Sequence, residues 1–241
     1  MRARAGFEVM DLGAPMDVLW MRISRKPSDP AQSLGHVEAG RFLITLDRGD
    51  YWQCAFLIRK GSFADFQARG MEAFHREVVQ LAPYLSDRID ELRDWQQISL
   101  LSVTVDRLRT WCCRGLLCIG DAAHAMSPIG GVGINLAIQD AIATANALVV
   151  HLRGGNVDIE ALREVQRRRE FPTRMTQGIQ LFIQNRFISR VLNGSQSLQL
   201  PLFLKMARRW PILRRIPARI VGIGFRPEHI KTPETMPAQS L

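Results

Sequence analysis

Short apolar runs alternate with turn-forming residues over the first hundred residues, a pattern typical of β-strands. Asp47-Arg48-Gly49-Asp50 separates two of these runs and predicts a hairpin turn, in which Gly49 supplies a positive φ. We expect strands at Val18–Ile23, Arg41–Leu46, Tyr51–Ile58 and Gln97–Val105.

One helix is expected in the same half of the chain. Ser62 is a suitable N-cap, with Asp65 three positions later, and Pro83 should stop the helix. The apolar residues Phe63, Phe66, Met71, Phe74, Val78 and Leu81 recur at helical spacing between these limits. The first half therefore resembles an antiparallel sheet covered by a helix.

The middle of the chain has a different pattern. Gly115–Ile119 is wholly apolar, as expected of a strand that is buried on both faces. After a glycine-rich stretch, Gly131–Leu152 predicts a long helix that ends at Gly154-Gly155. A second long helix should begin near Asp158, and Pro172 should kink or break it.

Charge is concentrated in one segment of this 241-residue chain, whose formal net charge is +9. Residues 171–227 hold ten Lys and Arg and no Asp or Glu, whereas residues 1–170 are neutral overall. Within that segment, residues 198–225 interleave apolar and basic side chains, which is the composition of a helix lying on an anionic membrane surface. A solvated basic face packed on the rest of the protein fits the same composition.

Several classes of function are disfavoured. The four cysteines form no CxxC pair and have no metal-ligand spacing with the histidines, so we expect no metal site. GxSxG, HExxH and P-loop motifs are absent, as is any recognisable nucleic-acid-binding module. Without a signal-like stretch or a run of about 18 apolar residues, we expect a cytoplasmic protein, with peripheral contact at the inner face of a membrane as an alternative.

The segment from Gly120 to Asn135 carries the clearest chemistry. Asp121 follows the apolar strand, where its carboxylate could accept a hydrogen bond from a sugar hydroxyl. Pro128 should form a rigid wall with an exposed carbonyl. Three glycines, at 130, 131 and 133, allow the backbone to approach a flat ligand. The helix that begins there presents unpaired N–H groups, suited to a phosphate or to the pyrimidine edge of a flavin.

A glycine-bearing strand-to-helix turn is the purely structural alternative, but the combination of features within sixteen residues favours a ligand site. LLCIGDAAHAMSPIGGVGINLAIQDA resembles the second FAD-binding motif of the aromatic-ring hydroxylase group of flavoproteins, which includes p-hydroxybenzoate hydroxylase and the ubiquinone-biosynthesis hydroxylases. The matching residues are Gly120, Asp121, Ala122, Ala123, His124, Pro128, Gly131, Gly133 and Asn135.

The resemblance implies a role for each residue of the motif. Asp121, preceded by Gly120, would bind a hydroxyl of the ribityl chain or ribose of FAD. Pro128 would lie beside the reactive C4a edge of the flavin. The backbone N–H groups of Gly133, Ile134 and Asn135 would approach the pyrimidine edge, close to Gly131. His124 and Asp140 are expected to be structural, His124 as a hydrogen-bond donor and Asp140 as a cap or as the partner of an arginine.

The fold implied is the C-terminal part of a p-hydroxybenzoate hydroxylase-like α+β/α/β FAD fold. We expect a substrate-covering sheet domain at 1–105, the flavin-binding strand, glycine-rich turn and long helix at 106–155, and a helical, basic region at 156–241. The group's N-terminal GxGxxG motif does not occur in this sequence. The resemblance therefore predicts that this chain carries the flavin half of the FAD site and lacks the ADP-binding part.

The activity implied is that of an FAD-dependent monooxygenase that uses NAD(P)H and O₂ through a C4a-peroxyflavin and acts on a small aromatic or lipophilic substrate. We assign no catalytic residue. An FAD-dependent reductase or dehydrogenase of the same group is one alternative. The other is an inactive truncated chain that binds a membrane or a partner through its basic C-terminal region.

Overall fold

The computed structural model describes residues 2–194, 219 and 222–231. The chain forms two compact units, whose boundaries differ from those of the three segments expected from the sequence. Among the described residues, unit 1 comprises 2–13, 104–180, 219 and 222–231, and unit 2 comprises 14–103 and 181–194. The first thirteen residues thus belong with the glycine-rich segment, and each unit is discontinuous in sequence.

Unit 2 is built on a five-stranded antiparallel sheet of order β3-β4-β5-β2-β6. Its strands are β2 (Met16–Ser24), β3 (Leu34–Glu38), β4 (Arg41–Asp47), β5 (Tyr51–Arg59) and β6 (Ser99–Leu101). Four of these were expected, although β6 is shorter than Gln97–Val105, and β3 was not expected. Gly49 has a φ of +89°, which confirms its predicted role in the hairpin turn.

Two helices replace the single helix expected between Ser62 and Leu81: α1 (Phe63–Arg69) and α2 (Met71–Leu81). The prediction was wrong because Gly70 adopts φ +82° and ψ 163°, a conformation that ends α1 and begins α2. Ser62 is not the expected side-chain cap, since its hydroxyl donates to the carbonyl of Arg59. The predicted stop is confirmed, because α2 ends at Leu81 and a 3₁₀ turn, Pro83–Leu85, follows.

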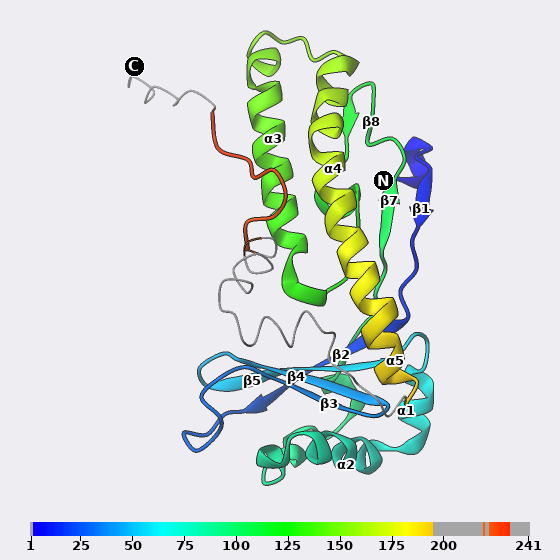
Figure 1. Ribbon diagram of the computed structural model, residues 1–241, viewed down its shortest axis with the longest axis vertical. Helices are drawn as coiled ribbons and strands as arrows, with labels where there is room; N and C mark the ends of the chain where they lie inside the picture. Colours follow the sequence, from blue (N-terminus) through cyan, green and yellow to red (C-terminus); the bar gives the residue numbers. More distant parts are fainter. Residues whose placement is uncertain (1, 195–218, 220–221, 232–241) are drawn as a thin grey trace. The chain divides into compact units, whose positions relative to one another are not determined.

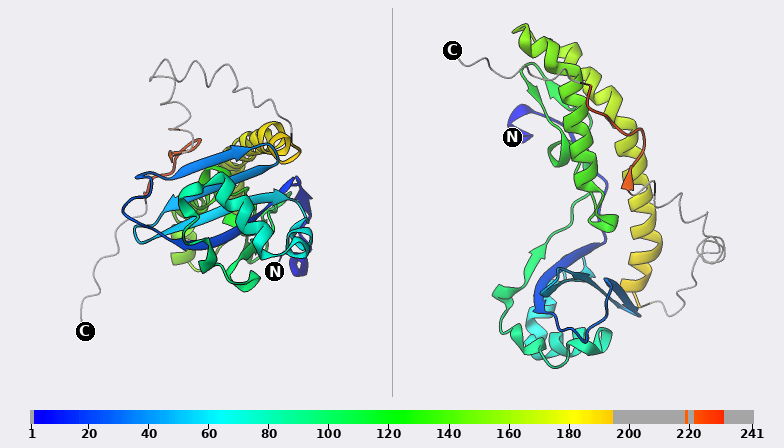
Figure 2. Two further views of the ribbon diagram at one scale, coloured as in Figure 1. Left: turned by 90° about the horizontal axis from the view of Figure 1, so that it is seen from below. Right: turned by 90° about the vertical axis from the view of Figure 1, so that its left-hand side faces the viewer.

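The two faces of this sheet differ in burial. Helix α2 lies across one face (Figures 1 and 2), where Trp52, Cys54 and Phe56 of β5 join its core. On the opposite face, Trp20 and Ile44 are both paired with Ala55 across three adjacent strands, and both are half-buried. Side chains alternate between faces along a strand, so these residues form a second apolar surface on the sheet.

The strands of unit 1 are short. β1 (Val9–Asp11) pairs with β7 (Asp106–Leu108), and β8 (Cys112–Cys113) pairs with β9 (Leu116–Leu117). The strand expected at Gly115–Ile119 is therefore only two residues long, and its leucines are half-buried rather than buried on both faces. Gly115, with φ +79°, forms the turn of this hairpin instead of extending the strand.

Two long helices lie side by side in unit 1 (Figures 1 and 2): α3 (Gly133–Arg153) and α4 (Ile159–Ile183), which continues into unit 2. The prediction of α3 is confirmed, including its end at Gly154. Pro172 was expected to kink or break this helix, and it does not break it, because α4 runs through this residue. By length and composition alone, residues Ile129–Arg153 could cross a membrane, but core helices of soluble proteins share this property.

After α4, a π-helical turn (Gln184–Ile188) leads to α5 (Ser189–Leu192), which contacts β4 and β5. Most of the basic amphipathic segment, residues 198–225, lies outside the described residues.

Candidate cofactor site

The glycine-rich segment forms an irregular loop between β9 and α3. It contains two 3₁₀ turns, Gly120–Ala122 and Ile129–Gly131. Gly120 has φ +56°, and a Cβ added to it would lie 3.0 Å from the Cβ of Ala137 in α3. Both the backbone conformation and the close approach of α3 therefore require glycine at this position.

Among the described residues, no side chain caps the N-terminus of α3. Its N-cap residue, Val132, makes no side-chain hydrogen bond to the first turn. Gly130 and Gly131 have φ of +78° and +63°, and a Cβ on Gly131 would meet nothing within 4 Å. Ile134, in the first turn, is 69% exposed. The first turn of α3 therefore has no side-chain cap among the described residues, and one of its residues is well exposed, which are the features that the expected donor cluster would need.

The structure also shows the surroundings of three other residues of the motif, Asp121, Pro128 and Gly133. Asp121 is exposed, and its carboxylate has no hydrogen-bond or ion-pair partner in the part of the chain that the structure describes. Pro128 has the expected φ of −66°, but its carbonyl accepts a hydrogen bond from Gly131 N at 3.1 Å. The carbonyl is therefore engaged in the turn itself. Gly133 is helical, and a Cβ there would lie 3.4 Å from the Cβ of Met126.

A buried ionic network lies behind the first turn of the loop. Asp140 of α3 accepts hydrogen bonds on Oδ2 from Gly120 N at 3.0 Å and His124 Nε2 at 2.6 Å. Its Oδ1 accepts one from Arg169 Nε of α4 at 2.8 Å. All three side chains are at most 1% exposed. Burial tends to raise the pKa of Asp140, but the bonds from His124, Arg169 and Gly120 outweigh it and lower the pKa.

This network confirms the structural roles expected for His124 and Asp140. His124 donates to a carboxylate within the protein, and its ring packs against that of Trp111, with 5.1 Å between the ring centroids. Asp140 pairs with an arginine, as expected, although that arginine belongs to the other long helix.

The middle of the loop is held by amide side chains of α4. Gln177 Nε2 donates to the carbonyls of Asp106 at 2.8 Å and Ala125 at 3.1 Å. Gln180 Nε2 donates to the carbonyls of Ser127 and Ile129, both at 2.9 Å. Four main-chain carbonyls in β7 and the loop thus receive hydrogen bonds from two side chains.

Sequence reasoning missed these residues of α4, although the sequence contains a signal for them. Arg169, Thr173, Gln177, Gln180 and Gln184 follow one another at intervals of three or four, so they share one face of the helix. All five are buried. A polar stripe at the spacing of a helix's buried face indicates hydrogen-bonding partners elsewhere in the protein.

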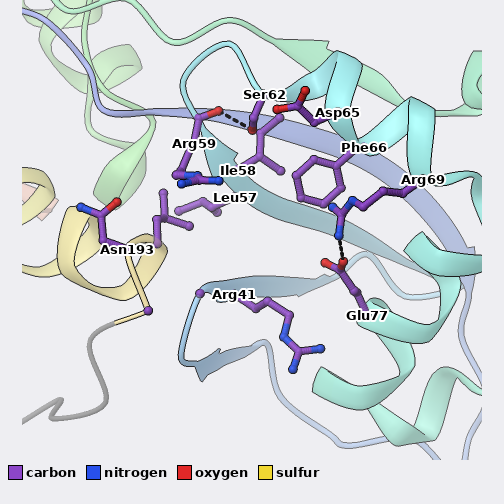
Figure 3. A pocket seen from close by; sticks show the side chains of 13 residues that line it. Arg41, Leu57, Ile58, Arg59, Ser62, Asp65, Phe66, Arg69, Glu77 and Asn193 are labelled. Atoms are coloured by element: carbon purple, nitrogen blue, oxygen red, sulfur yellow. Dashed lines mark hydrogen bonds and ion pairs between the residues drawn. The ribbon is translucent and has the colours of Figure 1, made fainter.

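A separate cavity of about 640 Å³ lies in unit 2, between the end of β5, helix α1 and the end of α5 (Figure 3). Arg69 in its wall pairs with Glu77 and lies over the ring of Phe66, 4.2 Å from the centroid. None of the predicted flavin-binding residues lines this cavity. Among the described residues, no group of three or more His, Cys, Asp or Glu could hold a metal ion.

Known proteins resemble this chain over most of its length. 6-Methylpretetramide 4-monooxygenase from Streptomyces rimosus is 29% identical over 205 residues, which make up 85% of this chain and 48% of that protein. Kynurenine 3-monooxygenase from Stenotrophomonas maltophilia is 33% identical over 183 residues, or 71% of this chain and 35% of that protein. This chain therefore spans about half of these curated relatives or less.

A solved structure supports the fold. PqsL from Pseudomonas aeruginosa, in complex with 2-aminobenzoylacetate, aligns with a TM-score of 0.63 and 20% identity over 80% of this chain and 54% of that chain. A family model described as an FAD binding domain matches residues 1–178. That match covers well over half of the chain and includes the whole loop from Gly120 to Asn135, so this protein belongs to the FAD binding domain family.

Proposed function

We propose that the loop from Gly120 to Asn135 binds the ribityl and isoalloxazine part of FAD. The uncapped start of α3 supports this, because its N–H groups and dipole suit the electron-rich pyrimidine edge of a flavin. Asp121 supports it as well, since an exposed carboxylate without a protein partner among the described residues is available to a ribityl hydroxyl. Gly131, Gly133, Ile134 and Asn135 would then provide backbone contacts.

The other predicted residues would shape the site without donating to the flavin. Gly120 lets the loop approach α3 closely enough for its N–H to reach Asp140. Pro128 begins the tight turn that brings Gly131 back toward the loop, and its ring would form a rigid apolar wall beside the flavin. The open space beside Gly131 supports the approach of a flat ligand at this turn.

The whole protein would be an FAD-dependent monooxygenase with NAD(P)H as its electron donor. This proposal rests on the names of its curated relatives, which include 6-methylpretetramide 4-monooxygenase and kynurenine 3-monooxygenase. When bound, FAD supplies the redox chemistry and the reaction with oxygen. The residues described here bind the cofactor, orient it and keep the loop's polar groups satisfied.

Its substrate would be a small aromatic molecule that lies against the second apolar face of the unit 2 sheet. Trp20, Ile44 and Ala55 are in register on that face, where Trp20 and Ile44 are half-buried and Ala55 is buried. The structural neighbour PqsL was solved in complex with 2-aminobenzoylacetate. The sheet would thus be the substrate-covering part of the protein.

Titration with FAD, followed by flavin fluorescence, tests the cofactor site. We expect Asp121→Ala to weaken binding about tenfold, because a charge-assisted hydrogen bond is lost. Asp65→Ala removes another exposed carboxylate outside the loop and is the matched control. Equal affinity of the Asp121→Ala variant and the wild-type chain would contradict the proposal. Incorporation of oxygen from O₂ into product would separate a monooxygenase from a reductase of the same group.

A further inference from the structure

The polar stripe is defined by Arg169, Thr173, Gln177 and Gln180 of α4 and by Gln184 at the start of the π-helical turn that follows. It occupies positions where a helix normally carries core leucines or valines. Burying a polar side chain is unfavourable unless it forms hydrogen bonds. Gln177 and Gln180 donate hydrogen bonds to the loop that precedes α3. Arg169 donates to Asp140, which in turn binds the start of that loop. Such a concentration of buried donors on one loop calls for a role beyond packing.

The three donors reach successive points of the loop. Arg169 acts at its beginning, because it holds Asp140, which in turn accepts from Gly120 N and His124. Gln177 binds the carbonyl of Ala125. Gln180 binds the carbonyls of Ser127 and Ile129. The loop is therefore held by hydrogen bonds from its first glycine to the turn before α3, directly by Gln177 and Gln180 and through Asp140 by Arg169.

The orientation of both amides is fixed by their partners. Gln177 Oε1 accepts a hydrogen bond from Arg107 Nη1 at 2.9 Å, so its Nε2 must face the carbonyls of Asp106 and Ala125. Gln180 faces two carbonyl oxygens, which can be satisfied only by N–H donors. These contacts with the loop thus depend on N–H donors, and a side chain of similar size without such donors could not form them.

The carbonyls of Ala125, Ser127 and Ile129 all bond to α4 in this arrangement. The three carbonyls belong to the stretch that leads into the 3₁₀ turn Ile129–Gly131, so α4 holds the loop up to the point where this turn begins. A loop held in this way loses little conformational entropy when a ligand binds, and preorganisation of this kind increases affinity.

We infer that Arg169, Gln177 and Gln180 are positioning residues that hold the flavin loop in its binding conformation before the cofactor arrives. They act through the loop backbone and Asp140. The part of this inference that concerns affinity rests on the proposed function, whereas the part that concerns loop conformation does not.

Hydrogen exchange of the loop amides in the flavin-free chain tests the inference. Gln180→Met keeps an unbranched side chain of similar length but removes both donors, so we expect exchange over residues 125–131 to increase by about tenfold or more. We expect its FAD dissociation constant to increase by a similar factor. If Gln180→Met fails to fold, Gln177→Met gives the same comparison with the loss of the bonds to Asp106 and Ala125.

Gln166→Met is the matched control. Gln166 lies on the same helix and also makes two backbone hydrogen bonds, with Trp111 N at 2.9 Å and the Arg109 carbonyl at 3.0 Å, but neither is in the loop. Its loss should leave loop exchange and FAD affinity unchanged. Unaltered loop exchange in Gln180→Met, or an equal change in Gln166→Met, would overturn the inference. A wild-type chain that takes up no FAD would refute the proposed function, and loop exchange would still decide the positioning role.

Discussion

Substitution of Asp140 by asparagine tests the buried network most severely. Asp140 and Arg169 are both 0% exposed, and one oxygen of the carboxylate also accepts from Gly120 N and His124. The asparagine side chain would keep the shape and one acceptor oxygen, but it would remove the charge. Arg169 would then be left as a buried cation without its closest carboxylate, because the next one, Glu228, is 3.8 Å away.

The expected loss follows from that uncompensated charge. Removal of one partner of a buried ion pair costs about 3–5 kcal/mol, and we expect the lower end because the amide retains one acceptor. For a chain of this length, a loss of about 3 kcal/mol corresponds to a decrease of roughly 6–12 °C in melting temperature. An exposed pair of the same type would contribute at most about 1 kcal/mol.

The pH dependence has a definite sign. The pKa of Asp140 is lowered in the folded protein because the bonds from His124, Arg169 and Gly120 outweigh the effect of burial. The ionised carboxylate therefore contributes stability above its unfolded pKa of about 3.9, and this contribution is lost as the pH falls through the lower, folded value. The difference in stability between wild type and Asp140→Asn should be full at neutral pH and shrink in acid.

Urea unfolding followed by far-ultraviolet circular dichroism measures this difference, since α3 and α4 are the longest described helices. A double variant, Asp140→Leu with Arg169→Met, is the control. It should be less destabilised than the sum of its single variants, because neither charge is left unpaired. A free energy of unfolding for Asp140→Asn within about 0.5 kcal/mol of wild type would refute the argument.

Further predictions concern glycines and a second buried ion pair. Gly120→Ala should reduce the free energy of unfolding by about 1–3 kcal/mol more than Gly131→Ala. Both glycines have positive φ, but only a Cβ at position 120 would lie 3.0 Å from the Cβ of Ala137. Urea unfolding measures both variants, and equal losses would contradict the clash. Gly70→Ala should lose about 1–3 kcal/mol for its φ of +82°, measured in the same way, and no loss would mean that α1 and α2 can join. Asp29 is buried against Arg88, and its pKa is lowered because hydrogen bonds outweigh burial. Asp29→Asn should therefore be destabilised at neutral pH and approach wild type below about pH 4 in a pH-dependent melting series; a constant difference would contradict this.

Local patterns predicted much of the fold. Alternation of apolar residues located β4 and β5, Gly49 located their turn, and helical spacing located α3 and its end. Helix continuity was less predictable at residues that can either end a helix or lie within it. Gly70 breaks a continuous helical pattern, whereas Pro172 does not break α4. Neither outcome is determined by the spacing of apolar residues alone.

In the candidate site, too, the local motif was recognisable from the sequence, whereas the distant contacts were not. The motif from Gly120 to Asn135 was recognisable because its glycines, proline and aspartate are close in sequence. Gln177 and Gln180 bind loop carbonyls about fifty residues earlier, at separations of 52 and 53 positions. Contacts at such separation leave no local pattern, except that polar residues occupy the buried face of a helix.

A hydrogen-exchange footprint of FAD on this chain tests the central claim most directly. If the loop from Gly120 to Asn135 holds the flavin half of FAD, saturating FAD should slow exchange of the amides of Gly133, Ile134 and Asn135, which no side chain of the described residues caps. Amides in the core of the unit 2 sheet should be unaffected and provide the internal control. Binding of FAD with unchanged exchange at the start of α3 would contradict the account.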